Sequence, residues 1–171
     1  MDSWDLDVEA GMTITSGPPL DRPLGVHAGF VALYERELGK QIRRATLLVG
    51  SSEDAHDLVH DAFVEVYRRW EQLRDPGPYL GTAVLNRCRD HGRRKLVRAR
   101  HVPPPPEGAV HEDEVLWDAL MKLPFNHRAA LVLRFYQQLP EGEIARLLGC
   151  RPGSVGPWIQ RGLRTLRKDL S

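Results

Sequence analysis

The stretch that decides the fold is PEGEIARLLGCRPGSVGPWIQRGLRTLRKDL, residues 140–170 of a 171-residue chain. An apolar stripe opens at Ile144 and Ala145, and Gly149 supplies a turn because glycine readily adopts the positive φ of a helix C-terminus. A second helix follows, with an inward face of Val155, Trp158 and Ile159. Its later turns carry Arg161, Arg164, Arg167 and Lys168. Two short helices with a basic second member predict a helix-turn-helix suited to the DNA major groove.

Charge is distributed unevenly along the chain, although the formal net charge is only +1. Residues 87–100 hold seven cations against Asp90 alone, and residues 53–65 hold five carboxylates with no lysine or arginine. Such blocks of opposite sign indicate two surfaces with two different partners. Cys88 and Cys150 are too few for a disulfide framework or a zinc site, and we expect both to be buried thiols.

The length of the apolar runs and the residues at the N-terminus indicate where in the cell to expect the protein. No apolar run approaches the length needed to span a membrane, and the acidic N-terminus does not resemble a secretion signal. We therefore expect no membrane insertion and a reducing, cytoplasmic location.

Apolar side chains recur at intervals of three and four, which predicts an all-α protein. We expect a disordered acidic tail over 1–25, a helical domain over 26–97, a proline-rich linker over 98–111 and a second helical domain over 112–171.

Turn and capping residues divide these domains into helices. The first helix is expected to break near Gly39 and to end at Gly50. We expect Ser51 and Ser52 to cap a second helix, and a third helix to start near Tyr79. In the second domain we expect helices over 112–122, 126–137 and 140–148, and a last one that ends near Leu170.

Three segments in this order resemble bacterial sigma-70 factors of the compact extracytoplasmic-function (ECF) group. They are EDAHDLVHDAFVEVYRRW (53–70), YLGTAVLNRCRDHGRRK (79–95) and EGEIARLLGCRPGSVGPWIQRGLRTLRKDL (141–170). Each motif is degenerate alone, whereas the three in this order and spacing are specific. The resemblance covers roughly residues 27–170 and implies a specificity subunit of RNA polymerase that is not an enzyme and needs no metal or cofactor.

The resemblance implies that the second helix of the first domain binds core RNA polymerase. Its outward carboxylates would meet basic residues of that partner, although an acidic helix face alone is usually just solvated. The candidate residues are Asp57, Leu58, His60, Asp61, Val64 and Glu65.

The resemblance also implies that the loop after Leu73 and the following helix capture a flipped base of the −10 promoter element. Holding unstacked bases requires aromatic platforms and cations along the backbone. Tyr79 is the aromatic candidate, either for stacking or as a core aromatic at the helix start. The candidate residues are Arg74, Asp75, Tyr79, Asn86, Arg89, Arg93, Arg94 and Lys95.

The second domain would bind the −35 element as duplex DNA. The family commonly has Thr-Val-Lys-Ser-Arg after the turn, whereas this chain has Ser-Val-Gly-Pro-Trp at 154–158. Because proline lacks an N–H, Pro157 suits a first turn, and we expect the helix to start late with Ser154 as its cap. Trp158 either packs inside or presses on sugar and thymine methyl groups. The candidate residues are Arg151, Ser154, Gly156, Pro157, Trp158, Gln160, Arg161 and Arg164.

Two other functions compete with this interpretation. His56 and His60 in HDLVH resemble the HExxH zinc-hydrolase motif, but Asp57 is shorter than the usual glutamate and no obvious third ligand follows. A stand-alone helix-turn-helix regulator would explain residues 140–170, but not the aromatic and basic helix beside a proline-glycine loop. Such a regulator should occupy an operator without polymerase.

The N-terminal tail contains one distinctive segment, in which Trp4, Leu6 and Val8 alternate with Asp5, Asp7 and Glu9. It is either solvated or docked on a basic surface, where it would mask the basic helix. Many relatives in the family are held inactive by an anti-sigma factor that clamps both domains, so such a partner is a further expectation.

Overall fold

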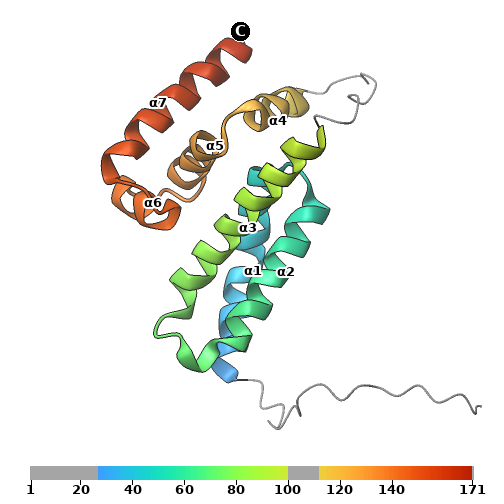
Figure 1. The fold of residues 1–171 in the computed structure, drawn as a ribbon, viewed down its shortest axis with the longest axis vertical. Coiled ribbons are helices and arrows are strands. Elements are labelled where there is room, and N and C mark those ends of the chain that lie inside the picture. The colour runs from blue at the N-terminus through green and yellow to red at the C-terminus, as the bar shows by residue number, and fades with distance from the viewer. Residues whose placement is uncertain (1–26, 100–111, 171) are drawn as a thin grey trace, which may run out of the picture.

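The computed structural model describes residues 27–99 and 112–170, and over these residues helices are the only regular structure (Figure 1). The helices are α1 (Ala28–Val49), α2 (Ser52–Arg68), α3 (Pro76–Ala99), α4 (Glu112–Lys122), α5 (Phe125–Leu131), α6 (Glu141–Leu148) and α7 (Pro152–Asp169). A 3-10 turn, η1 (Trp70–Gln72), follows α2, and a π-helical segment, η2 (Val132–Tyr136), continues α5. The all-α class is confirmed, whereas the tail 1–25 and the proline run 103–106 lie outside the described residues.

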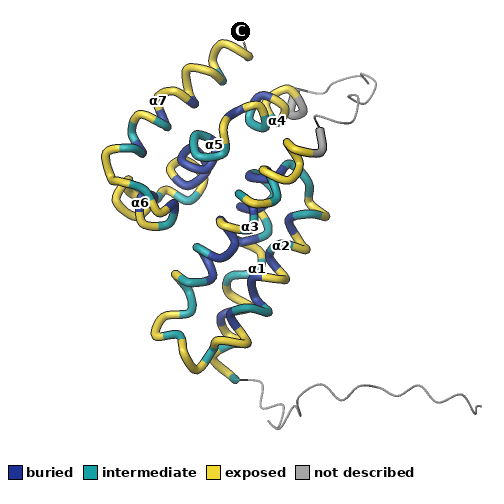
Figure 2. The backbone as a smooth tube through the Cα atoms, in the orientation of Figure 1, coloured by how far each residue is buried: buried dark blue, intermediate teal, exposed yellow. Residues whose placement is uncertain are grey.

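Helices α1, α2 and α3 form the first bundle, and their buried positions face one another (Figure 2). The predicted apolar stripe of α2 provides much of this core, because apolar residues spaced by three and four share one helix face. The fully buried side chains of the bundle include Leu48, Val59, Phe63, Val66, Leu80, Val84 and Leu85. Cys88 is also fully buried in it, while Cys150 is only partly buried, so the expectation of two buried thiols holds for one.

Local signals set the boundary between α1 and α2 as predicted. Gly50 adopts φ +82° at the end of α1, and Ser51 caps α2 by accepting a hydrogen bond from the Asp54 N–H at 3.1 Å. The predicted break near Gly39 is wrong, since α1 runs unbroken through it. Packing of Leu38 and Ile42 against the core outweighs the helix penalty of one glycine, which is about 1 kcal/mol.

Helices α4 to α7 form the second bundle, in which α6 and α7 are the predicted helix-turn-helix. Gly149 ends α6 with φ +65°, and Ile144 and Val155 are fully buried on the two facing helices. Gly162 allows α7 to approach α5 closely, because a Cβ added there would lie 2.8 Å from Leu131 Cδ1. The single helix predicted over 126–137 is instead α5 followed by the π-helical η2.

Helix α7 begins at Pro152, so the prediction of a late start capped by Ser154 is wrong. Arg151 is the N-cap, and Pro152 takes the first helical position, where a missing N–H is tolerated. Pro157 lies inside the helix. The residue before it, Gly156, has no Cβ to collide with the proline ring, so one of the clashes that disfavour helical backbone before a proline is absent.

The two bundles lie against each other. Helix α3 contacts α6, and α1 contacts α4, α5 and η2 (Figure 1). None of the helices in the described part of the chain is long and apolar enough to cross a membrane.

Candidate functional site

The predicted polymerase-binding residues of α2 do not share one environment. Asp57, His60 and Asp61 are exposed, whereas Leu58 and Val64 are partly buried. The exposed members form an acidic face that a basic partner can approach directly.

Glu65 faces α3 rather than pointing fully outward as expected. Its carboxylate accepts a hydrogen bond from the Tyr79 hydroxyl, and its Oε2 lies 2.8 Å from Nη2 of Arg87. The Tyr79 hydrogen bond and the Arg87 charge hold the pKa of Glu65 below its usual value. Glu65 therefore joins α2 to α3 in this state.

Tyr79, the proposed stacking platform, is partly buried at the start of α3. Besides its hydrogen bond to Glu65, its ring lies 5.8 Å from the Arg69 guanidinium carbon, within the range of a cation–π contact. The bond to Glu65 raises the pKa of the Tyr79 hydroxyl. A base that stacked on the ring would have to compete with Arg69. Arg74 and Asp75, in the preceding loop, are exposed.

The cations of α3 divide into two groups. Arg93, Arg94 and Lys95 are exposed, as is Asn86, which accepts a hydrogen bond from Arg89 Nη1 at 3.4 Å. Arg89 is partly buried and reaches the second bundle. Its Nη2 donates to the Leu148 carbonyl at the end of α6, at 3.1 Å, and its guanidinium carbon lies 5.4 Å from the centre of the Phe125 ring. Part of the predicted −10 surface is thus occupied by the chain itself.

The predicted −35 residues gather on α7 and at its N-cap. Arg151, Pro157, Gln160, Arg161 and Arg164 are exposed, and Ser154, Gly156 and Trp158 are partly buried. Trp158 packs against the core, in agreement with the packing alternative. The exposed polar side chains present amide and guanidinium donors, which are the groups that read base edges and phosphates.

Arg44 joins the two bundles, and sequence reasoning missed it. Its side chain is almost fully buried, where it donates to the Gly81 carbonyl at 2.9 Å, to Gln137 Oε1 at 3.3 Å and to Gln41. Burial lowers the pKa of Arg44 to about 10, so it stays charged at neutral pH. The available signal was its position on the inward stripe of α1, beside Ala45.

A second bond crosses between the bundles next to Arg44. Arg43 Nε donates to the Tyr136 hydroxyl at 2.9 Å, and both side chains are on the exposed side of the junction. Tyr136 and Gln137 follow each other at the end of η2, so this short segment receives both arginines of α1.

The HDLVH segment gives no metal centre in the described residues. His56 and His60 are both exposed on α2, and no group of three His, Cys, Asp or Glu side chains able to hold a metal occurs in that part of the chain.

Comparisons with known proteins agree with this architecture. A model of "Sigma-70 region 2" matches residues 33–96, and one of "Sigma-70, region 4" matches residues 113–166. The RNA polymerase sigma-E factors of Streptomyces coelicolor and Streptomyces avermitilis are 31% and 34% identical over 141 residues, which cover 75% of this chain and 78% of each relative. The ECF sigma factor BldN of S. coelicolor is 30% identical over 82% of this chain and 60% of its own length.

Among solved structures, the sigma factor RpoE of Bartonella quintana, in complex with the anti-sigma factor NepR, has a TM-score of 0.68 at 19% identity, with 83% of this chain and 96% of that chain covered. CnrH, in complex with the cytosolic domain of CnrY, has a TM-score of 0.59 at 23% identity, with 81% of this chain and 85% of that chain covered. At these identities the likeness concerns the fold.

The two bundles are those of a two-region helical transcription factor, with a helix-turn-helix as its second part. The chain belongs to the sigma-70 family of RNA polymerase sigma factors, in its ECF group.

Proposed function

We propose that this chain binds core RNA polymerase and directs initiation at specific promoters. Region 2 (α1–α3) opens and holds the −10 element, and region 4 (α4–α7) binds the −35 duplex. The supporting observation is the arrangement of the exposed charges, with an acidic face on α2, cations on α3 and further cations on α7. The polymerase supplies the chemistry, and the factor works where the polymerase is, in the cytoplasm.

Binding both promoter elements requires the bundles to separate. Arg89 must release the Leu148 carbonyl before it can pair with a phosphate, and α6 must move away from α3 so that α7 can follow the DNA. The predicted proline-rich linker, 98–111, would allow this movement, although its first two residues belong to α3. The twelve residues that follow, 100–111, could span at most about 40 Å.

An anti-sigma factor is the proposed protein partner besides polymerase. The structurally similar sigma factor RpoE of Bartonella quintana is known in complex with the anti-sigma factor NepR, and CnrH is known in complex with the cytosolic domain of CnrY. The contact surface in this chain would combine residues of both bundles, so that the inhibitor competes with core enzyme for the exposed face of α2.

Run-off transcription with purified bacterial core polymerase, with and without the protein, tests the proposal. The template is fragmented DNA of the source organism. We expect discrete new transcripts that require the protein and whose start sites share two upstream motifs. Absence of transcripts, together with tight operator-like binding without core enzyme, would replace the proposal with a stand-alone regulator.

A further inference from the structure

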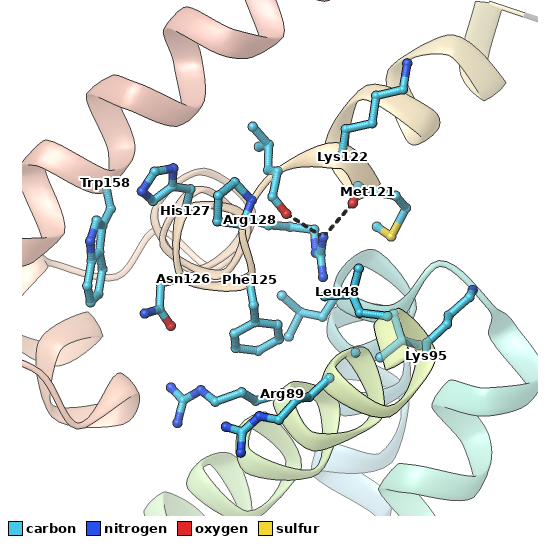
Figure 3. Close-up of a pocket in the computed structure, with 16 residues that line it drawn as sticks. Leu48, Arg89, Lys95, Met121, Lys122, Phe125, Asn126, His127, Arg128 and Trp158 are labelled. Atoms are coloured by element: carbon cyan, nitrogen blue, oxygen red, sulfur yellow. Dashed lines mark hydrogen bonds between the residues drawn. The ribbon is translucent and has the colours of Figure 1, made fainter. Parts of the chain in front are cut away.

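A cleft of about 700 Å³ lies between the two bundles (Figure 3). Its walls come from the end of α1, the C-terminal half of α3, the turn between α4 and α5, and the first half of α7. Most of its apolar lining is contributed by Leu48, Leu96, Met121, Leu123, Phe125 and Trp158. Leu96 is 69% exposed, which leaves a large aliphatic side chain at the mouth of the cleft.

Cations surround this apolar floor. Arg89, Arg93 and Lys95 contribute from α3, and Lys122 from the end of α4, while none of the described lining residues is Asp or Glu. Arg93, Lys95 and Lys122 are exposed. Like charges gathered along one cleft repel one another, and a negatively charged occupant relieves that repulsion. The cleft thus suits a segment that is apolar on one side and acidic on the other.

The same chain contains such a segment. Residues 4–9, Trp-Asp-Leu-Asp-Val-Glu, alternate apolar and acidic side chains, so in an extended conformation the two kinds face opposite ways. We propose that residues 4–9 dock in the cleft between the bundles, with Trp4, Leu6 and Val8 on its floor. Asp5, Asp7 and Glu9 then face its cationic rim.

The tail is long enough to reach the cleft. It joins the first bundle at Ala28, and Leu48 and Val49 near the other end of α1 line the cleft, about 30 Å away along a helix of this length. The 18 residues between Glu9 and Ala28 can extend to about 60 Å. Because the segment is tethered, its effective concentration at the cleft is on the order of millimolar, which favours it over a separate peptide of equal affinity.

Docking would hold the bundles in their present arrangement, because both contribute walls to the cleft. Arg89 would remain on Leu148, and Arg93 and Lys95 would be covered by carboxylates. This regulatory consequence rests on the proposed function, whereas the docking itself does not.

Photo-crosslinking in the full chain tests the docking. The variant Trp4→p-benzoylphenylalanine is irradiated at low protein concentration, and the crosslinked residues are mapped by mass spectrometry. We expect monomeric, intramolecular crosslinks to cleft residues such as Leu96 and Met121, with a yield that falls as salt rises. Crosslinks elsewhere on the chain, or only between two copies, would overturn the proposal.

Charge reversal sharpens this test. Lys95→Glu with Lys122→Glu should reduce the crosslink yield at least about threefold, since exposed ion pairs contribute modestly. Lys40→Glu is the matched control, because Lys40 is an exposed cation of α1, outside the cleft, whose Nζ lies 3.8 Å from Glu37. Equal yields in the parent, the double variant and the control would show that the cleft cations do not hold the tail.

Transcription separates this inference from the proposed function. Deletion of residues 1–25 should increase promoter binding and run-off transcription at limiting core enzyme. Protein-dependent transcripts without cleft crosslinks would overturn the docking and leave the sigma function in place. Cleft crosslinks in a protein that supports no transcription with core would uphold the docking and reject the function.

Discussion

The two proposed DNA-binding surfaces, on α3 and on α7, are in different states. On α3, Tyr79 and Arg89 already hold partners within the chain, namely Glu65 and the Leu148 carbonyl. On α7, Gln160, Arg161 and Arg164 extend into solvent. The side chains on α3 can bind DNA only after they leave their partners within the chain. The side chains on α7 are already exposed and can contact duplex DNA without such a change. We therefore expect region 2 to be the controlled surface and region 4 to be the ready one.

The largest expected effect concerns the junction that keeps α3 occupied. Arg44 is 2% exposed, and Arg44→Ala would leave the Gly81 carbonyl without this donor and open a cavity. The free energy of unfolding should fall by about 2–3 kcal/mol, as chemical denaturation would measure. Arg43→Ala, which removes one bond at an exposed position, should cost about 0.5 kcal/mol or less. Equal stabilities of the two variants would contradict the role of Arg44.

The two cysteines report whether Arg44→Ala also separates the bundles. Cys88 is fully buried in the first bundle, and burial raises its pKa to about 12, so it should react with thiol reagents only on unfolding. Cys150 follows α6 at the junction, and its labelling rate should increase in the variant. An unchanged rate at Cys150 would mean that the bundles stay together without Arg44.

The next effect tests the exposed surface of α7. Arg161→Ala with Arg164→Ala should weaken binding of the holoenzyme to its −35 element by about 2 kcal/mol in total, which is about 1 kcal/mol per lost base contact. Binding to matched and substituted −35 fragments measures this change, and the difference between the fragments should shrink. Lys168→Ala, in the last turn of the same helix, should weaken binding to both fragments equally. If the double variant still distinguishes the matched from the substituted −35 fragment as well as the parent does, these arginines do not read bases.

A smaller effect is expected from the exposed cations of α3. Arg93→Ala with Arg94→Ala should reduce promoter opening about tenfold on all promoters alike, because phosphate contacts carry no sequence information. Permanganate reactivity of the melted strand measures the opening. The promoter affinity should also depend less on salt. The slope of its logarithm against the logarithm of the salt concentration should change by about 0.7 for each lost phosphate contact to a single strand. If the double variant opens promoters as well as the parent, the assignment of α3 is wrong.

The smallest effect concerns Tyr79 and its bond to Glu65. Tyr79→Phe keeps the ring and removes the hydroxyl, so stability should fall by about 0.5–1 kcal/mol while promoter opening is retained. Tyr79→Ala should slow opening if a base stacks on the ring. Equal opening by the Phe and Ala variants would show that the ring is not a platform.

The pH dependence of stability gives a second readout for the Tyr79–Glu65 pair. The pKa of Glu65 is lower in the folded chain, so its contribution is present above the ordinary carboxyl pKa and is lost as pH falls through the folded value. Tyr79→Phe should therefore lose less stability in acid than the parent does. Thermal melting between neutral and acidic pH measures the difference.

Sequence periodicity predicted the elements whose formation depends on local pattern. Ala55, Val59 and Phe63 of α2 are spaced by four and are all buried, and Gly50 and Gly149 end helices at the expected places. These outcomes follow from helix geometry and from the positive φ that glycine tolerates. The start of α7 was predicted wrongly because Pro157 was weighed without Gly156, which has no Cβ to clash with the proline ring, and without Pro152, which suits the first helical position.

The contacts between the bundles could not be predicted in this way. Arg89 and Leu148 are 59 positions apart, and Arg44 and Gln137 are 93 apart. Local spacing carries no information on such pairs, so Arg89 was assigned to DNA alone. The polar residues on α7 were easier to place, because a helix-turn-helix determines which face its second helix presents.

The π-helical segment η2 has a consequence for how this protein can vary. A π turn contains one residue more than an α turn, and here the Gln137 N–H bonds to the Val132 carbonyl five residues earlier, at 3.2 Å. Because the π turn accommodates its extra residue within one turn, deletion of one residue from 132–135 would leave an α turn whose following side chains keep nearly their present direction. Tyr136 and Gln137 would still face α1, and the helix-turn-helix would keep its orientation. A deletion in a regular turn of α5 would instead rotate everything after it by about 100° and redirect region 4 as a unit. The π turn is thus the one place in this helix where the described chain can lose a residue without re-aiming region 4.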